Sequence, residues 1–217
     1  MKPEVAILIP CMNSMPYLKV AVRCLIESTG FLFKLILIES ESTDGTKEYC
    51  DEMAQKENIE VYHIKKKGLQ NAINYGIKKA GKLDTYITHD DVIHFKLMNR
   101  DWLREMYETS KADKIGTVTS LRGYGISGPL YYNGLRWVGT WSMYLPRKTI
   151  NEIGLFDENM RTGDDIDYAY RCMKKDKKIA FIDYWVQHHR LTSHGDVDKP
   201  EVIAKMAKYF RKKYKLE

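Results

Sequence analysis

Two pairs of adjacent aspartates are the residues in this sequence whose type and spacing are best suited to chemistry. Asp90-Asp91 follows the apolar run Tyr86–Thr88, and Asp164-Asp165 follows Gly163. Carboxylate oxygens are the ligands that Mg²⁺ and Mn²⁺ prefer, usually one or two from the protein together with substrate phosphates. A carboxylate at the start of a helix can also act as a rigidly held general base. Adjacent aspartates are equally common in turns and helix caps, so each pair alone also fits a structural role.

The elements that must position these aspartates alternate between strand and helix. Apolar, β-branched runs predict strands at Val5–Pro10, 34–39, 59–64 and 84–88, and helical spacing of apolar residues predicts helices at 16–29, 46–55 and 68–80. This alternation predicts right-handed βαβ crossovers and an α/β fold with a mostly parallel twisted sheet flanked by helices. The expected organisation is a single domain, with residues 1–91 as one half and 92–198 as the other.

Ligands of open α/β sheets bind at the carboxyl ends of the strands. The polar residues directly after each predicted strand are therefore candidates: Asn13, residues 39–44, residues 65–68 and residues 89–91. After residue 91 the alternation loosens, with a helix expected around 97–109 and a strand near 115–120. The Gly- and Tyr-rich stretch 123–141 fits a sugar-stacking surface and equally a loop pinned by core aromatics.

The composition is that of an ordinary globular protein, with 44% hydrophobic and 29% charged residues among 217. No apolar run reaches the eighteen or so residues that a membrane-spanning helix needs, and no signal peptide is recognisable, so a cytoplasmic location is expected. Four scattered cysteines without CxxC spacing indicate neither a zinc site nor a disulfide framework.

The net charge of +6 is concentrated at the end of the chain. Residues 201–217 carry six basic and two acidic side chains, which supply +4 of it. Residues 199–217 are expected to form a basic amphipathic helix with Ile203, Met206, Phe210 and Tyr214 on one face. Such a helix can pack on its own domain, or it can make a peripheral contact with a membrane surface.

Several motifs along the chain occur together in one known family. They are Pro10-Cys-Met-Asn13, the turn Ser42-Thr-Asp-Gly-Thr46 after Leu37-Ile-Glu-Ser-Glu, the pair Asp90-Asp91, and Phe156-Asp-Glu158 followed by Gly163-Asp-Asp-Ile-Asp167 and Arg171. In order and spacing they resemble the family 2 glycosyltransferases of GT-A (Rossmann-like) fold. The resemblance covers about Val5 to Ser193.

The resemblance implies an inverting glycosyltransferase that moves a sugar from a nucleotide diphosphate sugar to an acceptor hydroxyl. It implies Mn²⁺ or Mg²⁺ as cofactor, a UDP-sugar as the default donor, and a saccharide, lipid-linked or protein acceptor. No nucleic-acid partner is expected. Asp165, with Asp164 beside it, is implied as the general base. The other implied site residues are Pro10, Asn13, Glu39, Lys67 and Asp90 for the nucleotide sugar, and Asp91, Asp90 and His189 for the metal.

Departures from the family pattern affect the donor side. Glu39 stands where an Asp is usual, Ser40-Glu41 replaces Asp-Gly, and Ile73 stands where an Arg often precedes the Asn matched by Asn74. Asp164 replaces a common Glu. Two other functions remain as alternatives. A sugar nucleotidyltransferase would usually carry a Gly-rich basic loop after the first strand, which residues 10–16 lack. The second alternative is a non-catalytic nucleotide- or nucleic-acid-binding protein that uses the basic tail.

Overall fold

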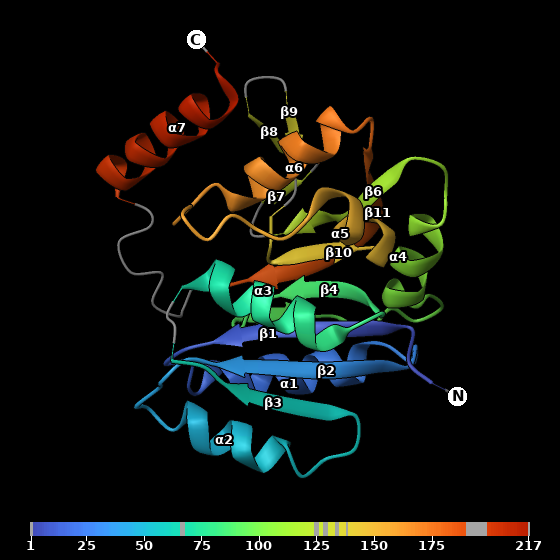
Figure 1. Cartoon of the computed structure of the whole chain (residues 1–217). Helices are drawn as coiled ribbons and strands as arrows, with labels where there is room; N and C mark the ends of the chain where they lie inside the picture. The colour runs from blue at the N-terminus through green and yellow to red at the C-terminus, as the bar shows by residue number, and fades with distance from the viewer. Residues whose placement is uncertain are drawn as a thin grey trace.

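The computed structural model describes residues 2–65, 68–123, 126–127, 130–132, 135–137, 139–189 and 199–216 (Figure 1). The strands are β1 Val5–Cys11, β2 Phe33–Glu39, β3 Ile59–His63, β4 Asp84–Thr88, β5 Val92–His94, β6 Ile115–Gly123, β7 Ile126–Ser127, β8 Leu130–Tyr132, β9 Leu135–Trp137, β10 Ser142–Leu145 and β11 Lys178–His188. The helices are α1 Tyr17–Ser28, α2 Thr46–Met53, α3 Leu69–Ala80, α4 Trp102–Ser110, α5 Arg147–Ile153, α6 Asp164–Lys174 and α7 Pro200–Tyr214.

One nine-stranded sheet runs through both halves of the chain, in the order β3-β2-β1-β4-β10-β6-β11-β5, with β7 paired to β6. The first half is parallel throughout, as the strand and helix alternation predicts. In the second half β10 runs antiparallel to both β4 and β6, while β6 and β11 are parallel. The α/β sheet flanked by helices is therefore confirmed, and its second half is mixed.

Helices cover both faces of the sheet, because alternate strand residues point to opposite sides. Val5, Ile7 and Ile9 of β1 pack with α1, α2 and α4 in one core. Ala6 and Leu8 pack with α3, α5 and α6 in the other core. The parallel strands are accordingly apolar on both faces, which is why they read as continuous hydrophobic runs.

The parallel register brings the carboxyl ends of β1, β2 and β3 level with one another. Cys11 pairs with Glu39, and Glu39 pairs with His63. Residues paired in this way on neighbouring strands point to the same face of the sheet. The loops that follow these strands and β4 therefore meet at one edge, where the sequence predicts a ligand site.

Three local expectations differ from the structure. β1 continues one residue past Pro10, to Cys11. The helix expected at 97–109 begins only at Trp102, because the Asp101 carboxylate accepts hydrogen bonds from the Leu103 and Arg104 amides and caps it there. The short strand β5 precedes that helix and has no counterpart among the predicted elements.

The C-terminal helix α7 packs on its own domain beside α6 (Figure 1). Met206 and Phe210 are buried, whereas the side chains of Lys205, Lys208, Arg211, Lys212 and Lys215 are exposed. Across the residues that the structure describes, no helix combines the length and the apolar character needed to cross a bilayer.

Candidate functional site

The loops that follow β1, β2 and β4 are joined by hydrogen bonds at the carboxyl edge of the sheet. The Asn13 amide donates to Ser42 Oγ at 3.0 Å, and Asn13 Oδ1 accepts from the Thr43 amide at 2.8 Å. Ser14 Oγ donates to Asp90 Oδ2. Asn13 has a positive φ of 52°, a conformation that Asn adopts more readily than most residues. Three of the predicted motifs thus form one connected surface.

Glu39, at the end of β2, is held from two sides. Its Oε1 accepts from the Ser42 amide at 2.5 Å, and its Oε2 lies 2.7 Å from His63 Nδ1. His63 Nε2 lies 2.9 Å from Asp51 Oδ1, so the imidazole bridges two carboxylates. Burial alone would raise the pKa of Glu39, but the His63 and Ser42 hydrogen bonds lower it below its ordinary value. The hydrogen bond to Glu39 raises the pKa of His63.

This bridge makes a pH-dependent contribution to stability. The lowered pKa of the Glu39 carboxyl stabilises the fold at pH values above its pKa in the unfolded chain. This contribution is lost as the pH falls through its pKa in the folded protein. The raised pKa of the His63 imidazole stabilises the fold at pH values below its pKa in the unfolded chain. This contribution is lost as the pH rises through its pKa in the folded protein. We expect His63→Ala to reduce the free energy of unfolding by about 1 kcal/mol near pH 6, a value limited by the partial exposure of His63.

The measurement is urea unfolding of wild type and His63→Ala between pH 5 and pH 9. The difference between the two proteins should shrink toward pH 9. A difference that stays constant across this range would show that the imidazole charge does not contribute. Asp51→Asn, which removes only the exposed partner, is the matched variant and should show a smaller effect.

Asp91 lies in a group of potential metal ligands with two histidines. One ligand atom from each of His89, Asp91 and His188 lies within 4.8 Å of the others. His188 Nε2 is 3.2 Å from Asp91 Oδ1, and both side chains are buried, while His89 is half-buried. His89 Nε2 also lies 3.2 Å from Thr140 Oγ1. A carboxylate and two imidazoles provide three potential ligands, fewer than the six that an octahedral ion takes.

The structure places His188, not His189, beside Asp91. Side chains alternate along β11, so that Tyr184, Val186 and His188 are buried while the residues between them are exposed. His189 lies beyond the strand and contacts Asp91 through its backbone amide, which donates to the Asp91 carbonyl at 3.2 Å. The side chain of His188 is therefore a member of this group, whereas metal binding by His189 stays a prediction. The period-two alternation of residues 184–188 was the signal that could have identified His188.

The second aspartate pair lies at the start of α6. Asp164 is buried and Asp165 half-buried, directly after Gly163 with its left-handed φ of 74°. Asp165 Oδ1 accepts from the Ile166 amide at 2.8 Å. Gln70, in the first turn of α3, interacts with the Asp164 carboxyl. Because α3 begins soon after β3 ends, this interaction places the pair near the same edge of the sheet as the loops above.

Burial shifts the acidity of this pair. It raises the pKa of Asp164 to about 6. Burial, and then the charge of Asp164, raise the pKa of Asp165 well above its ordinary value. A carboxylate whose pKa is raised toward neutrality is a stronger proton acceptor than an ordinary one. The pair is therefore suited to accept a proton, beyond the capping role that its position also allows.

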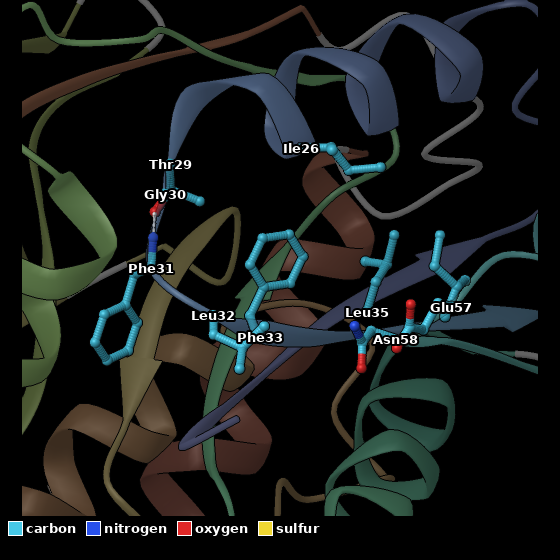
Figure 2. A pocket seen from close by; sticks show the side chains of 10 residues that line it. Ile26, Thr29, Gly30, Phe31, Leu32, Phe33, Leu35, Glu57 and Asn58 are labelled. Carbon is cyan, nitrogen blue, oxygen red and sulfur yellow. Dashed lines mark hydrogen bonds between the residues drawn. The ribbon is translucent and has the colours of Figure 1, made fainter. Parts of the chain in front are cut away.

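Other predicted site residues are not among the contacts described above. Pro10 is buried inside β1. Lys67 lies outside the described residues, and so do several residues of the stretch 123–141. A depression of about 270 Å³ lies at the other end of the sheet, among residues at the amino ends of β2 and β3 such as Phe33 and Ile59 (Figure 2). It is lined mainly by apolar side chains and lies away from the aspartates.

Comparison with known proteins gives consistent matches. The chain is 33% identical over 213 residues to the minor teichoic acid biosynthesis protein GgaB of Bacillus subtilis, which covers 88% of this chain and 23% of GgaB. It is 24% identical to an uncharacterized glycosyltransferase of Rickettsia felis, covering 79% of this chain and 32% of that protein. The chain thus spans about a quarter to a third of the length of these relatives.

Solved structures share the fold at low sequence identity. A mannosyltransferase from Pyrobaculum calidifontis, PcManGT, in complex with GDP-Man and Mn²⁺, superposes with a TM-score of 0.75 at 14% identity, covering 100% of this chain and 65% of that one. TarS residues 1–349 of S. aureus, in complex with UDP-GlcNAc, gives a TM-score of 0.66 at 15% identity, covering 94% and 65%.

The sequence also matches a described family over most of its length. Residues 6–173, from β1 to α6, match glycosyl transferase family 2. This stretch contains the loops at the carboxyl edge, His89 and Asp91, and the aspartate pair of α6, whereas His188 lies beyond its end. The chain therefore belongs to glycosyl transferase family 2.

Proposed function

We propose that the protein transfers a sugar from a nucleotide diphosphate sugar to an acceptor hydroxyl, with inversion at the anomeric carbon. The observation that carries this proposal is the convergence of the loops after β1, β2 and β4 beside the His89, Asp91 and His188 group. Support comes from the family match and from similar folds solved with GDP-Man and with UDP-GlcNAc. A UDP-sugar is the donor we propose.

In this proposal the carboxyl edge binds the donor. Asn13, Glu39 and Asp90 form the surface for the nucleoside, because they end or follow the strands that meet there. Glu39 reaches this edge already oriented by His63, so the substitution of Glu for the usual Asp keeps a carboxylate in place. Lys67 remains a proposed phosphate contact.

A divalent cation fits the group around Asp91. His89, Asp91 and His188 would hold it, and when bound it would neutralise charge on the departing diphosphate. A mixed set of one carboxylate and two imidazoles suits Mn²⁺ better than Mg²⁺, because Mg²⁺ is usually bound by oxygen ligands alone. We therefore propose Mn²⁺ as the physiological ion.

Asp165 takes the proton of the acceptor hydroxyl in this mechanism. As the proton moves to the carboxylate, the acceptor oxygen bonds to the anomeric carbon and the bond from that carbon to the diphosphate oxygen breaks. Asp164 assists by raising the pKa of Asp165. Burial raises the pKa of Asp165 in the same direction, which makes its carboxylate a stronger proton acceptor.

The acceptor is the less constrained substrate. GgaB is a minor teichoic acid biosynthesis protein, and this likeness favours a hydroxyl of a cell-envelope polymer among the saccharide, lipid-linked and protein acceptors expected. The exposed basic side chains of α7 would suit an anionic polymer or surface. A peripheral membrane contact through them remains a prediction.

Calorimetry tests the donor side directly. UDP and GDP are titrated into the protein with Mn²⁺, with Mg²⁺ and with EDTA. We expect one nucleotide to bind in the micromolar range with Mn²⁺ and at least about tenfold more weakly with EDTA, since the cation supplies part of the phosphate binding. Failure of both nucleotides to bind with either ion would contradict the proposal.

A further inference from the structure

Helix α7 lies outside the family match, yet it contacts two of the family's acidic motifs. The match ends at residue 173, and α7 begins at Pro200. Near its end, Lys213 Nζ lies 2.8 Å from Asp157 Oδ2 and 2.7 Å from Asp167 Oδ1. Asp157 belongs to the motif Phe156-Asp-Glu158, and Asp167 belongs to the motif that contains Asp165. One lysine therefore joins both motifs.

Neighbouring tyrosines strengthen the same connection. Tyr214 OH donates to Asp167 Oδ1 at 2.7 Å, and Tyr209 OH donates to Asp157 Oδ2 at 3.0 Å. Burial would raise the pKa of Asp157, but hydrogen bonds from Lys213, the Asn159 amide and Tyr209 lower it to about 2. Asp157 is therefore a charged partner of α7 at neutral pH, and Asp167 is a second acidic partner of the same helix.

Apolar contacts fix where α7 lies. Phe210 packs edge-on against Tyr170 of α6, with ring centroids 5.3 Å apart, and Tyr214 lies 4.4 Å from the same ring. Met206 is buried nearby, and its sulfur accepts from the Arg161 amide. These contacts hold the helix in one position, so that Lys213 reaches the aspartates from a defined direction.

Asp167 depends on this arrangement because its side chain is fully buried. Its other cationic partner is Arg171, whose Nε lies 2.9 Å from Asp167 Oδ2. A buried carboxylate that loses a partner pays a large desolvation penalty. Without Lys213 and with Arg171 alone, the negative charge of Asp167 would be less compensated in the first turn of α6.

The first turn of α6 also carries the proposed base. Asp165 precedes Asp167 by two residues, and the charge of Asp167 acts on Asp164. Groups facing this pair from other elements include Gln70 of α3, while Lys213 and Tyr214 of α7 face Asp167. A change in the charge of Asp167 therefore acts on Asp164, the neighbour of the proposed base.

The other contact of Lys213, with Asp157, leads to the first half of the chain, residues 1–91. Asp157 is flanked by Phe156 and Glu158, and both are bound by Asn74 of α3. The Phe156 amide donates to Asn74 Oδ1 at 2.9 Å, and Asn74 Nδ2 donates to Glu158 Oε1 at 3.1 Å. Through Asp157, Lys213 is thus connected to the helix that follows the donor-binding edge.

We propose that Lys213 is a positioning residue for the reaction, and that α7 acts as a latch that holds the start of α6 and the 156–158 segment in their reactive arrangement. This role rests on the proposed function of Asp165. It assigns to a helix beyond the family match a part in proton transfer, in addition to any contact that its exposed basic face makes.

The test compares Lys213→Met with Lys213→Arg and with Lys56→Met, whose exposed side chain lies just after α2. Release of nucleoside diphosphate is measured with Mn²⁺ and a panel of UDP-, GDP- and dTDP-sugars, with water in place of the acceptor. We expect Lys213→Met to lower kcat about 10- to 100-fold with little change in donor KM, because the reacting geometry is disturbed and not the donor site. Lys213→Arg should recover most of the rate, and Lys56→Met should equal wild type.

The pH profile separates positioning from loss of stability. Removal of the Lys213 charge leaves more negative potential at Asp164 and Asp165, so their pKa values rise. The acid limb of kcat/KM should then move upward by roughly half a pH unit or more. A folded Lys213→Met with wild-type kcat and an unmoved acid limb would overturn the role. If Lys213→Met does not fold, Tyr214→Phe is measured instead, and the acid limb of its kcat/KM should move upward by a smaller amount. An unchanged acid limb in Tyr214→Phe would likewise overturn the proposed role.

Asp165→Asn and wild type are run in parallel. Absence of release by wild type would overturn the proposed function, and this role with it. Normal release by wild type, loss in Asp165→Asn and no change in Lys213→Met would overturn the latch alone.

Discussion

Asp165→Asn is expected to lower turnover about 1000-fold while leaving nucleotide affinity within about twofold of wild type. The amide cannot accept the hydroxyl proton, and a positioned general base contributes about 10²- to 10⁴-fold. Asp165 lies in the first turn of α6, and its Oδ1 accepts a hydrogen bond from the Ile166 amide. Asparagine retains an oxygen that can accept the same bond. Nucleoside diphosphate release gives the rate, and calorimetry with UDP or GDP gives the affinity.

The matched control is Asp164→Asn. Asp164 raises the pKa of Asp165 by its charge, so its neutralisation should move the acid limb of the rate to lower pH and reduce the maximal rate far less. Equal loss in both variants would show that the two carboxyls act as one unit. Full activity of Asp165→Asn would remove Asp165 from the role of base.

Asp91→Asn is expected to abolish the stimulation by Mn²⁺, to weaken Mn²⁺ binding by at least about 100-fold, and to weaken nucleotide binding about as much as EDTA does. The carboxylate is the charged member of the proposed ligand group, and loss of groups that support a metal ligand alone costs about 10- to 100-fold in metal affinity. Mn²⁺ titrations followed by electron paramagnetic resonance measure the ion directly, without requiring turnover.

Two histidine variants distinguish the structure from the sequence-based assignment. His188→Ala should weaken Mn²⁺ binding, since His188 Nε2 lies 3.2 Å from Asp91. His189→Ala should leave it nearly unchanged, because His189 contacts Asp91 through its backbone amide, which the variant retains. The reverse order of effects would favour His189 as the ligand. Asp176→Asn, an exposed carboxylate paired with Lys114, is the control for removal of a surface charge.

Local patterns along the chain predicted the first half, residues 1–91, well. The apolar runs of β1 and β2 and the acidic turn after β2 are continuous in sequence, and a parallel sheet brings successive strand ends to one edge. The proximity of Asn13, Glu39 and Asp90 followed from that rule alone. Pairing of Glu39 with His63 was not predicted, because it depends on the register between β2 and β3.

The group of potential metal ligands around Asp91 and the position of α7 were harder to predict, because both depend on contacts between distant segments. His188 is separated from Asp91 by almost a hundred residues, and the pairing of β11 with β5 brings it there. Only the alternation of buried and exposed side chains along β11 distinguishes His188 from His189. The Lys213 contacts with Asp157 and Asp167 join segments about fifty residues apart. The apolar face of a helix indicates that the helix packs against another element, but it does not identify that element.

Turnover by the unmodified chain tests the central claim most directly. The purified protein is incubated with Mn²⁺ or EDTA and the panel of UDP-, GDP- and dTDP-sugars, and release of nucleoside diphosphate is followed over time. We predict release from one donor that depends on Mn²⁺ and is lost in Asp91→Asn. No release from any donor, together with no nucleotide binding by calorimetry, would contradict the assignment of transferase activity to this chain.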